Sequence, residues 1–318
     1  MIFSFSMISR RLIRIKVFKL LFSRIHSDSR SLTGSIDELL ESMKKTVDLY
    51  YLLLTLPIAL KKQGISKIES GLKKFHPSPE ESNPNRKFVL NRVIEVLEND
   101  KARKSYTSKR GLHWSEHHAF VKKLYTDLQS KPYFVDYMNS QTSSFQEDLA
   151  LLTTFFETEL EDNEELYQLL EDQSIYWADD VAYVAGIILR VLSLLKEESA
   201  PEHPEMFKQQ VDQEYAVHLL EHSVLHYDDY LQLIRSFAHN WEADRMAATD
   251  ISLIVLGISE VVSCPTIPVK VTINEIVELS KYYSTPNSKL FVNGVLDKIV
   301  QHLQENGQIN KEGRGLIT

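Results

Sequence analysis

Glycine and proline are scarce in this sequence, with ten of each in 318 residues. Both residues interrupt regular helices and are frequent in the turns that join short strands. Their scarcity argues against a turn-rich β architecture and favours long helices. Hydrophobic residues make up 43% of the chain and charged residues 25%, a balance that allows a buried core. We therefore predict an all-α fold.

The sequence contains a single cysteine, Cys264. One cysteine excludes an intrachain disulfide and a multi-cysteine zinc site, and fits the reducing cytoplasm. The longest apolar run, residues 49–60, is interrupted by Pro57, so we expect no membrane-spanning helix and a cytoplasmic protein. The arginine- and serine-rich start also fits a mitochondrial transit peptide, and Met7 is an alternative to Met1 as the true start.

Charge is unevenly distributed along the chain, whose formal net charge is −8. Residues 1–30 carry a net charge of +6, whereas residues 146–205 carry −14. A basic end on an acidic body indicates a local contact with a polyanion, because carboxylates elsewhere repel phosphate. We therefore expect the start of the chain to bind a polyanion and the acidic middle segment to be dispensable for that contact.

Helical periodicity runs through most of the chain, and its apolar spacing predicts a first helix over 8–26. Gly34 and Ser35 predict a break. A capping box of Ser35 and Glu38 then predicts a helix that runs to about Lys62. Turn residues predict a connector over 75–85, and amphipathic spacing predicts later helices over 86–100, 115–130 and 145–160.

An internal repeat emerges when the chain is shifted by 64 residues without gaps, which lays 148–192 on 212–256. Trp177 then meets Trp241, and each tryptophan has an aspartate three residues later. Each copy has the pattern of two helices, a tryptophan and an apolar helix. We predict that the two tryptophans occupy equivalent places in two related structural units.

Two stretches match the H-x-x-E-H pattern of a metalloprotease class, residues 113–117 and 218–222. Histidines one helical turn apart can chelate zinc, with the glutamate as base. The repeat argues against this chemistry, since His218 and His222 align with threonines on a solvated face. No glycine-rich phosphate loop or nucleophile elbow is present, and Cys264 has no evident catalytic partner. We predict surface histidines, no metal, no cofactor and no enzymatic activity.

The last third of the chain carries a long series of ordered motifs. They are Asp244-Arg245, IPVKVTINE at 267–275, VELSKY at 277–282 and FVNGVLDKI at 291–299. With an arginine-containing start and KLLF at 19–22, this series resembles the NusB family of transcription antitermination factors. The resemblance covers about 1–30 and 206–318, and the intervening stretch looks like a large helical insertion.

The resemblance implies a division of the chain into four parts. A basic arm and first helix would occupy 1–33, and an inserted helical region would occupy 34–145. An acidic helical unit would follow at 146–205, and a NusB-like C-terminal helical domain at 206–318. The fold it implies is a pair of small helical bundles with additional inserted helices.

The resemblance also implies a function. Family members resembling this chain bind single-stranded boxA RNA of ribosomal RNA operons, together with a small-subunit ribosomal protein, NusE. They join an antitermination complex on RNA polymerase. RNA-contacting residues would be Arg10, Arg11, Arg14, Lys16, Asn287, Ser288, Lys289 and Phe291; the ribosomal protein would be contacted by Asp250 and Glu260. Arginine forks suit phosphates, and an exposed aromatic suits unpaired bases.

Three other functions compete with this one. Leu12 and Ile13 interrupt the arginine run, which favours a protein–protein scaffold that has lost RNA binding. A ribosomal RNA cytosine methyltransferase with a NusB-like domain is not expected, because no methyltransferase domain follows residue 318. A metal hydrolase would need the histidine patterns described above.

Gly294 lies inside the last predicted helix, where glycine costs about 1 kcal/mol of helix propensity. A small residue at this position would permit close approach of another helix or of RNA. Both interpretations are open from sequence.

Overall fold

A computed structural model describes residues 6–25, 31–238 and 247–316. Within these residues the fold is all-α, as predicted, and the only β feature is an isolated bridge between Ser6 and Glu205. The helices form two compact units, of which unit 1 comprises residues 1–43 and 205–318 and unit 2 comprises residues 44–204. The boundary between the units falls inside helix α2 (Leu32–Leu54).

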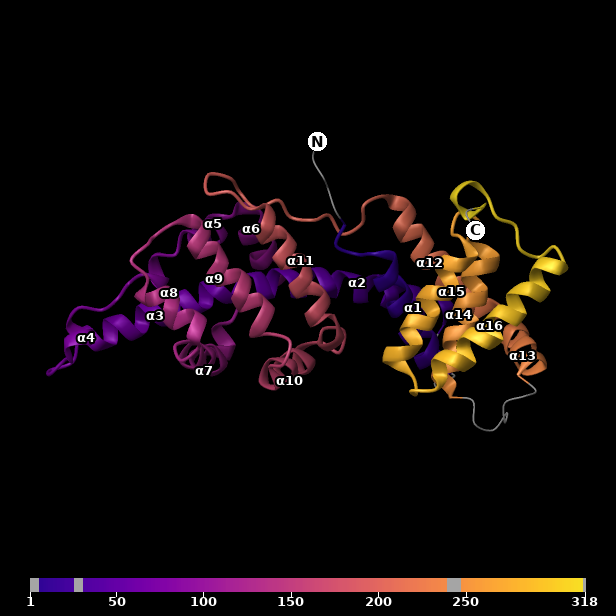
Figure 1. Cartoon of the computed structure of the whole chain (residues 1–318), viewed down its shortest axis with the longest axis horizontal. Helices are drawn as coiled ribbons and strands as arrows, with labels where there is room; N and C mark the ends of the chain where they lie inside the picture. The colour runs from indigo at the N-terminus through magenta and orange to yellow at the C-terminus, as the bar shows by residue number, and fades with distance from the viewer. Residues whose placement is uncertain (1–5, 26–30, 239–246, 317–318) are drawn as a thin grey trace. The chain divides into compact units, whose positions relative to one another are not determined.

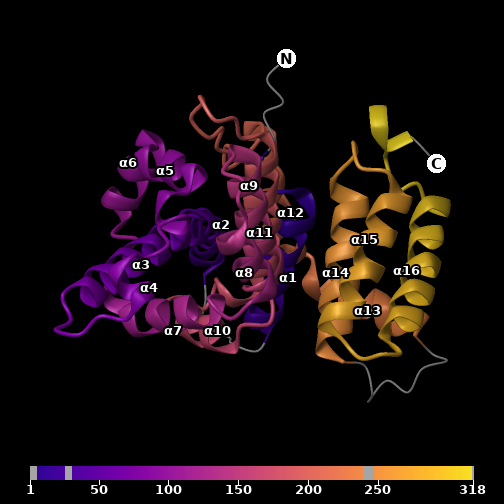
Figure 2. The ribbon, with the colours of Figure 1, turned by 60° about the vertical axis from the view of Figure 1, so that its left-hand side comes forward.

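Unit 1 is built around one nearly fully buried helix. Its helices are α1 (Arg10–Ile25), α12 (Gln210–Leu225), α13 (Tyr227–Phe237), α14 (Ala248–Ser263), α15 (Val269–Tyr283), α16 (Ser288–Glu305) and the 3-10 turn η5 (Gly313–Leu316). Every residue from Ser252 to Val261 of α14 is buried, which is typical of a helix that is apolar on all sides. Figures 1 and 2 show α14, α15 and α16 side by side, and α1, α12 and α13 also pack against α14.

Unit 2 holds the remaining helices in two packed groups. They are α3 (Leu56–Leu72), α4 (Pro79–Ser82), η1 (Phe88–Leu90), α5 (Arg92–Asn99), α6 (Lys101–Arg110), η2 (Ser115–His117), α7 (His118–Leu128), α8 (Pro132–Asn139), α9 (Phe145–Thr158), α10 (Glu164–Gln173), η3 (Ala178–Asp180) and α11 (Val181–Leu194). Helix α3 packs against α7 and η1, and α9 packs against α8 and α11. Helix α5 contacts both α3 and α9, so it joins the two groups into one core.

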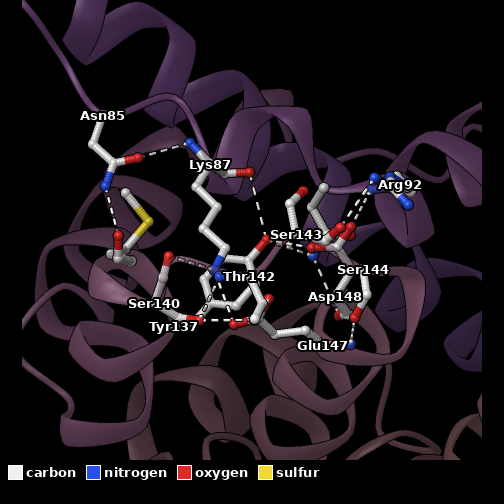
Figure 3. Close-up of polar contacts among 12 residues, drawn as sticks. Asn85, Lys87, Arg92, Tyr137, Ser140, Thr142, Ser143, Ser144, Glu147 and Asp148 are labelled. Carbon is white, nitrogen blue, oxygen red and sulfur yellow. Dashed lines mark hydrogen bonds and ion pairs between the residues drawn. The ribbon is translucent and has the colours of Figure 1, made fainter.

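A buried polar network fixes α5 against α9 in unit 2 (Figure 3). Asn91 caps α5 by accepting a hydrogen bond from the Ile94 amide at 2.9 Å, and its amide nitrogen donates to the Asp148 carbonyl at 3.2 Å. The Asp148 carboxylate accepts from the Tyr137 hydroxyl at 2.5 Å and from the Arg92 amide at 3.0 Å. Because each buried group has a partner, the network orients the helices without leaving an unpaired polar atom among these contacts.

The predicted helix from Ser35 to Lys62 is wrong in both its start and its continuity. Helix α2 begins at Leu32, so Gly34 and Ser35 lie inside it, and the Ser35 hydroxyl donates to the Ser31 carbonyl. The helix ends at Leu54, and a second helix, α3, starts at Leu56 with Pro57 in its first turn. Proline lacks the N–H that a continuous helix would need there.

The helix order supports the internal repeat, although it does not test the tryptophan pair. After the 64-residue shift, α9, α10 and α11 begin within three residues of α12, α13 and α14. Trp177 is buried and its indole donates to the Lys45 carbonyl at 2.7 Å. Trp241 and the Asp244-Arg245 motif lie outside the described residues, so the equivalence of the two tryptophans stays a prediction.

Two glycines of unit 1 lead to opposite expectations. A Cβ at Gly294 would meet nothing within 4 Å, so no neighbouring helix requires glycine there. A Cβ at Gly257 would lie 3.1 Å from Leu296 Cδ2 and 3.2 Å from Ile276 Cγ1, where α14, α15 and α16 meet. Close packing of helices therefore depends on Gly257 rather than on Gly294.

We expect Gly294→Ala to raise the free energy of unfolding by about 0.5–1 kcal/mol, because alanine has the higher helix propensity. Gly257→Ala should lower it by about 1–3 kcal/mol through overpacking. Urea unfolding followed by circular dichroism measures both changes. Destabilisation by Gly294→Ala would contradict the conclusion that no neighbouring helix requires glycine at this position.

Candidate nucleic-acid interface

Arg14 of α1 lies inside unit 1, where its guanidinium meets a carboxylate of α14. The side chain is 4% exposed, and Nε donates to the Glu260 carboxylate oxygens at 2.9 and 3.1 Å. A second carboxylate, Glu275 of α15, lies 3.6 Å from the guanidinium, an ion pair longer than a hydrogen bond. The Arg14 guanidinium therefore links α1, α14 and α15.

Tyr215 of α12 completes this buried cluster by donating its hydroxyl hydrogen to Glu260. Burial raises the pKa of Tyr215 well above its ordinary value, and the Glu260 charge raises it further. The phenol therefore stays protonated and remains a donor to the carboxylate. Glu260 is fully buried and has two partners, so its role is to compensate Arg14 inside the fold.

A second buried contact fixes the start of α16. The Ser288 hydroxyl donates to Asp250 Oδ2 of α14 at 2.8 Å, and the Thr285 amide donates to the Ser288 oxygen at 3.1 Å. Asp250 and Ser288 are both buried, and so is Phe291 one turn further along α16. These residues position the loop between α15 and α16.

Six of the ten predicted contact residues are buried in the structure. Buried side chains cannot meet RNA or a protein partner from this conformation, and this applies to Arg14, Lys16, Ser288, Phe291, Asp250 and Glu260.

The other four predicted residues are exposed, and they come from two helices. Arg10 and Arg11 lie at the start of α1, and Asn287 and Lys289 lie at the start of α16. Arg10 is partly engaged, since its guanidinium pairs with Asp212 at 3.3 Å and lies 5.2 Å from the centre of the Tyr215 ring.

Arg11 and Lys289 lie close to a third cation on α15. A hydrogen bond from Lys281 lowers the pKa of Glu278, and the charges of Arg11 and Lys289 lower it further. The charges of three cations from three helices therefore act on one exposed carboxylate, which Lys281 contacts directly. This arrangement leaves a surplus of positive charge on the surface.

Sequence reasoning missed one exposed aromatic beside these cations. Tyr282 follows Lys281 directly and is 73% exposed. Its neighbour Tyr283 packs on Phe18, with ring centres 5.4 Å apart, which fixes the end of α15 against α1. The Lys-Tyr-Tyr run at this helix end was the available signal. We call Arg11, Lys281, Tyr282 and Lys289 the cationic face.

His218 and His222 of α12 and His226, which caps the end of this helix, form a ladder of three histidines. His222 lies between His218 and His226, and its ring centre is 4.4 Å from that of His226. Burial and the charges of the neighbouring histidines together lower the pKa of His222 to about 4. Among the described residues no group of three histidine, cysteine or acidic side chains is placed to hold a metal ion.

We expect the ladder to make unit 1 acid-sensitive. Because the pKa of His222 is lower in the folded state than its ordinary value of 6.5, the unfolded chain binds more protons between pH 6.5 and 4. Stability is complete above pH 6.5 and falls as the pH drops, by about 1–2 kcal/mol after allowance for solvent screening of a half-buried group. His222→Gln should flatten the pH dependence of urea midpoints over this range, whereas exposed His76→Gln should not. Equal slopes for all three proteins would refute the assignment.

Cys264 is buried at the end of α14, and burial raises the pKa of its thiol to about 11. The thiol therefore stays protonated near neutral pH and is a poor nucleophile.

No helix in the described part of the chain is long and apolar enough to cross a membrane.

The fold and the cationic face define an all-helical protein whose C-terminal bundle presents cations and an aromatic on one surface. A model of the NusB family matches residues 190–301. Transcription antitermination protein NusB of Salinibacter ruber is 40% identical over 104 residues, which cover 33% of this chain and 65% of that protein. NusB of Chloroherpeton thalassium is 43% identical over 84 residues, covering 26% and 40%. NusB of Myxococcus xanthus is 40% identical over 109 residues, covering 34% and 74%.

The chain therefore belongs to the NusB family. It spans less than two thirds of the Salinibacter and Chloroherpeton proteins that it matches. No solved structure matches the chain. Residues 44–189, most of unit 2, lie outside the family match.

Proposed function

We propose that this protein is a transcription antitermination factor that binds single-stranded boxA-type RNA. In this proposal it acts with the small-subunit ribosomal protein NusE in a complex on RNA polymerase at ribosomal RNA operons, and it has no catalytic role. The names of its relatives support the antitermination role. The observation that carries RNA binding is the cationic face, where three helices bring cations beside an exposed tyrosine.

The residues of the cationic face suit a single strand. A guanidinium or ammonium group binds phosphate oxygens, and an exposed aromatic ring offers a surface on which an unpaired base can stack. Arg11, Lys281 and Lys289 would contact the backbone, and Tyr282 would contact a base. Arg10 and Asn287 lie near the starts of the same helices, α1 and α16, and would extend this contact.

The buried cluster supports the same proposal from within. Arg14, Glu260 and Glu275 join α1, α14 and α15, and so they hold Arg11 and Lys281 at fixed places on the surface. Cations that packed helices hold in place lose less conformational entropy on binding than cations on a mobile arm. Asp250 and Glu260, as buried groups, are not part of our proposal for the NusE contact.

The alternative is a protein–protein scaffold that keeps the fold without binding RNA. A labelled boxA-type strand should bind the protein and NusE together more tightly than it binds either alone, and a shuffled strand should bind weakly. Under the scaffold alternative, the protein would bind NusE but would add nothing to RNA affinity. Fluorescence anisotropy with purified components distinguishes the two outcomes.

A further inference from the structure

Unit 2 contains a second basic segment that the overall acidity of the middle of the chain conceals. Residues 101–123 include seven lysines and arginines and a single acid, Glu116. The segment comprises α6, η2 and most of α7. The acids that make the middle of the chain negative lie further on, in 146–205.

A cleft of about 450 Å³ opens between this segment and α3. Its ionisable lining residues are Lys62 of α3, Arg103 of α6, and His113 and His118 around the start of α7. None of the described lining residues carries a carboxylate. A cleft of this volume lies in the usual size range of small-ligand sites.

Arg103 is the anchored cation of the cleft. Its guanidinium donates to the Leu97 carbonyl at 2.8 Å and to the Glu98 carbonyl at 3.0 Å, at the end of α5. Carbonyl oxygens orient the fork without neutralising its charge. Burial lowers the pKa of Arg103 even though Asp100 and Glu98 oppose the change, which indicates incomplete compensation of the charge.

Lysines are in excess around Glu98 of α5, whose backbone carbonyl holds Arg103. Lys61 pairs with Glu98 at 2.7 Å, and Lys62 and Lys104 also lower the pKa of that carboxyl group. The charges of three lysines therefore act on this one carboxylate. Such a surplus favours an anionic ligand over a cation or an apolar segment.

Trp114 forms a wall of the cleft rather than a stacking surface. It is 5% exposed, its indole donates to the Leu52 carbonyl at 3.0 Å, and its ring stacks on Phe120. The wall is rigid, and Ser115 and His113, which are 2.8 Å apart, add polar groups at the mouth.

We propose that this cleft binds the phosphate group of a nucleotide-type ligand. The exposed ammonium of Lys62 can bind phosphate oxygens directly, and the buried guanidinium of Arg103 adds positive charge to the same cleft. The phosphate can come from a free nucleotide or from an RNA strand. The site lies outside the family match and does not depend on the proposed function of the cationic face.

The test uses the full chain carrying Arg11→Glu and Lys289→Glu, so that the cationic face does not compete for the probes. Inorganic phosphate, AMP and a short oligouridine strand are titrated, with calorimetry and tryptophan fluorescence as readouts. Lys62→Glu should weaken the binding of all three probes about tenfold. Lys73→Glu makes the same charge change at the other end of α3, where the side chain is exposed, and should leave affinity within about twofold.

The arms of the titration identify the source of the phosphate. If the natural ligand is an RNA strand, oligouridine should bind more tightly than AMP and with a steep salt dependence. If it is a free nucleotide, AMP should bind as tightly as oligouridine. Circular dichroism confirms that Lys62→Glu, an exposed substitution, leaves the fold intact. Absence of binding by all three probes, or equal losses for Lys62→Glu and Lys73→Glu, would overturn the proposal without affecting the cationic face.

Discussion

Replacement of Glu260 by alanine is expected to lower the free energy of unfolding by about 3–5 kcal/mol. The change removes the main partner of the Arg14 guanidinium, which is 4% exposed, and it also leaves the Tyr215 hydroxyl without its acceptor. A buried charge without its partner retains its full desolvation cost. Urea or guanidinium unfolding, followed by far-UV circular dichroism, measures the loss.

Two variants make this expectation specific. Arg11→Ala changes an exposed residue of the same helix and should alter stability by at most about 0.5 kcal/mol. Joint replacement of Arg14 by Met and Glu260 by Leu should recover much of the loss, since apolar groups of similar volume need no charge partner. A loss below about 1 kcal/mol for Glu260→Ala would show that the pair is solvated, contrary to the structure.

Joint replacement of Arg11, Lys281 and Lys289 by alanine is expected to weaken boxA-type RNA binding roughly 30- to 100-fold near physiological salt. Each phosphate contact on a single strand contributes about 0.7 to the slope of log affinity against log salt, so losing three should flatten the slope by about 2. All three side chains are exposed, and unfolding midpoints should change little. Anisotropy titrations at several salt concentrations measure both quantities.

Lys298→Ala provides the matched control for the charge change. Lys298 is exposed on α16, nine residues beyond Lys289, which places it on the opposite side of the helix. Its removal should leave the salt slope unchanged. If the triple variant and the control have the same slope as the unaltered protein, the cationic face is not the RNA contact.

The sequence predicted the all-α fold and several helices closely because their apolar periodicity is strong. The predicted helix over 8–26 corresponds to α1 at Arg10–Ile25, and the one over 145–160 to α9 at Phe145–Thr158. The error at α2 arose where local signals compete. Gly34 weakens a helix only by a modest amount, whereas Pro57 removes a backbone donor altogether and starts a new helix.

The site was harder to predict, because its residues were chosen by their chemical type and not by the helix face on which they lie. Arg14 shares its face with Val17, Phe18 and Leu21, at spacings of three, four and seven residues, and all four are buried. That spacing was visible in the sequence and marks Arg14 as a core residue. The carboxylate that compensates it lies 246 positions away, and no local pattern could reveal that pairing.

Ser288 and Phe291 at the start of α16 were also predicted as contacts from their residue type, although they lie on a buried face. Ser288 and Phe291 lie on the stripe that continues with Val292 and Val295 towards the core. Their neighbour Lys289 points to solvent. The second basic segment, 101–123, was missed for a different reason, since summing charge over the acidic middle concealed a local surplus.

Photocrosslinking of a boxA-type strand containing 4-thiouridine, followed by mass-spectrometric mapping on the full chain, tests the central claim most directly. The cationic face as the RNA contact predicts crosslinks at Tyr282 and in the adjoining starts of α1 and α16, and their loss when Arg11, Lys281 and Lys289 are replaced by alanine. Crosslinks confined to unit 2, or unchanged crosslinks at Tyr282 in the triple variant, would contradict it.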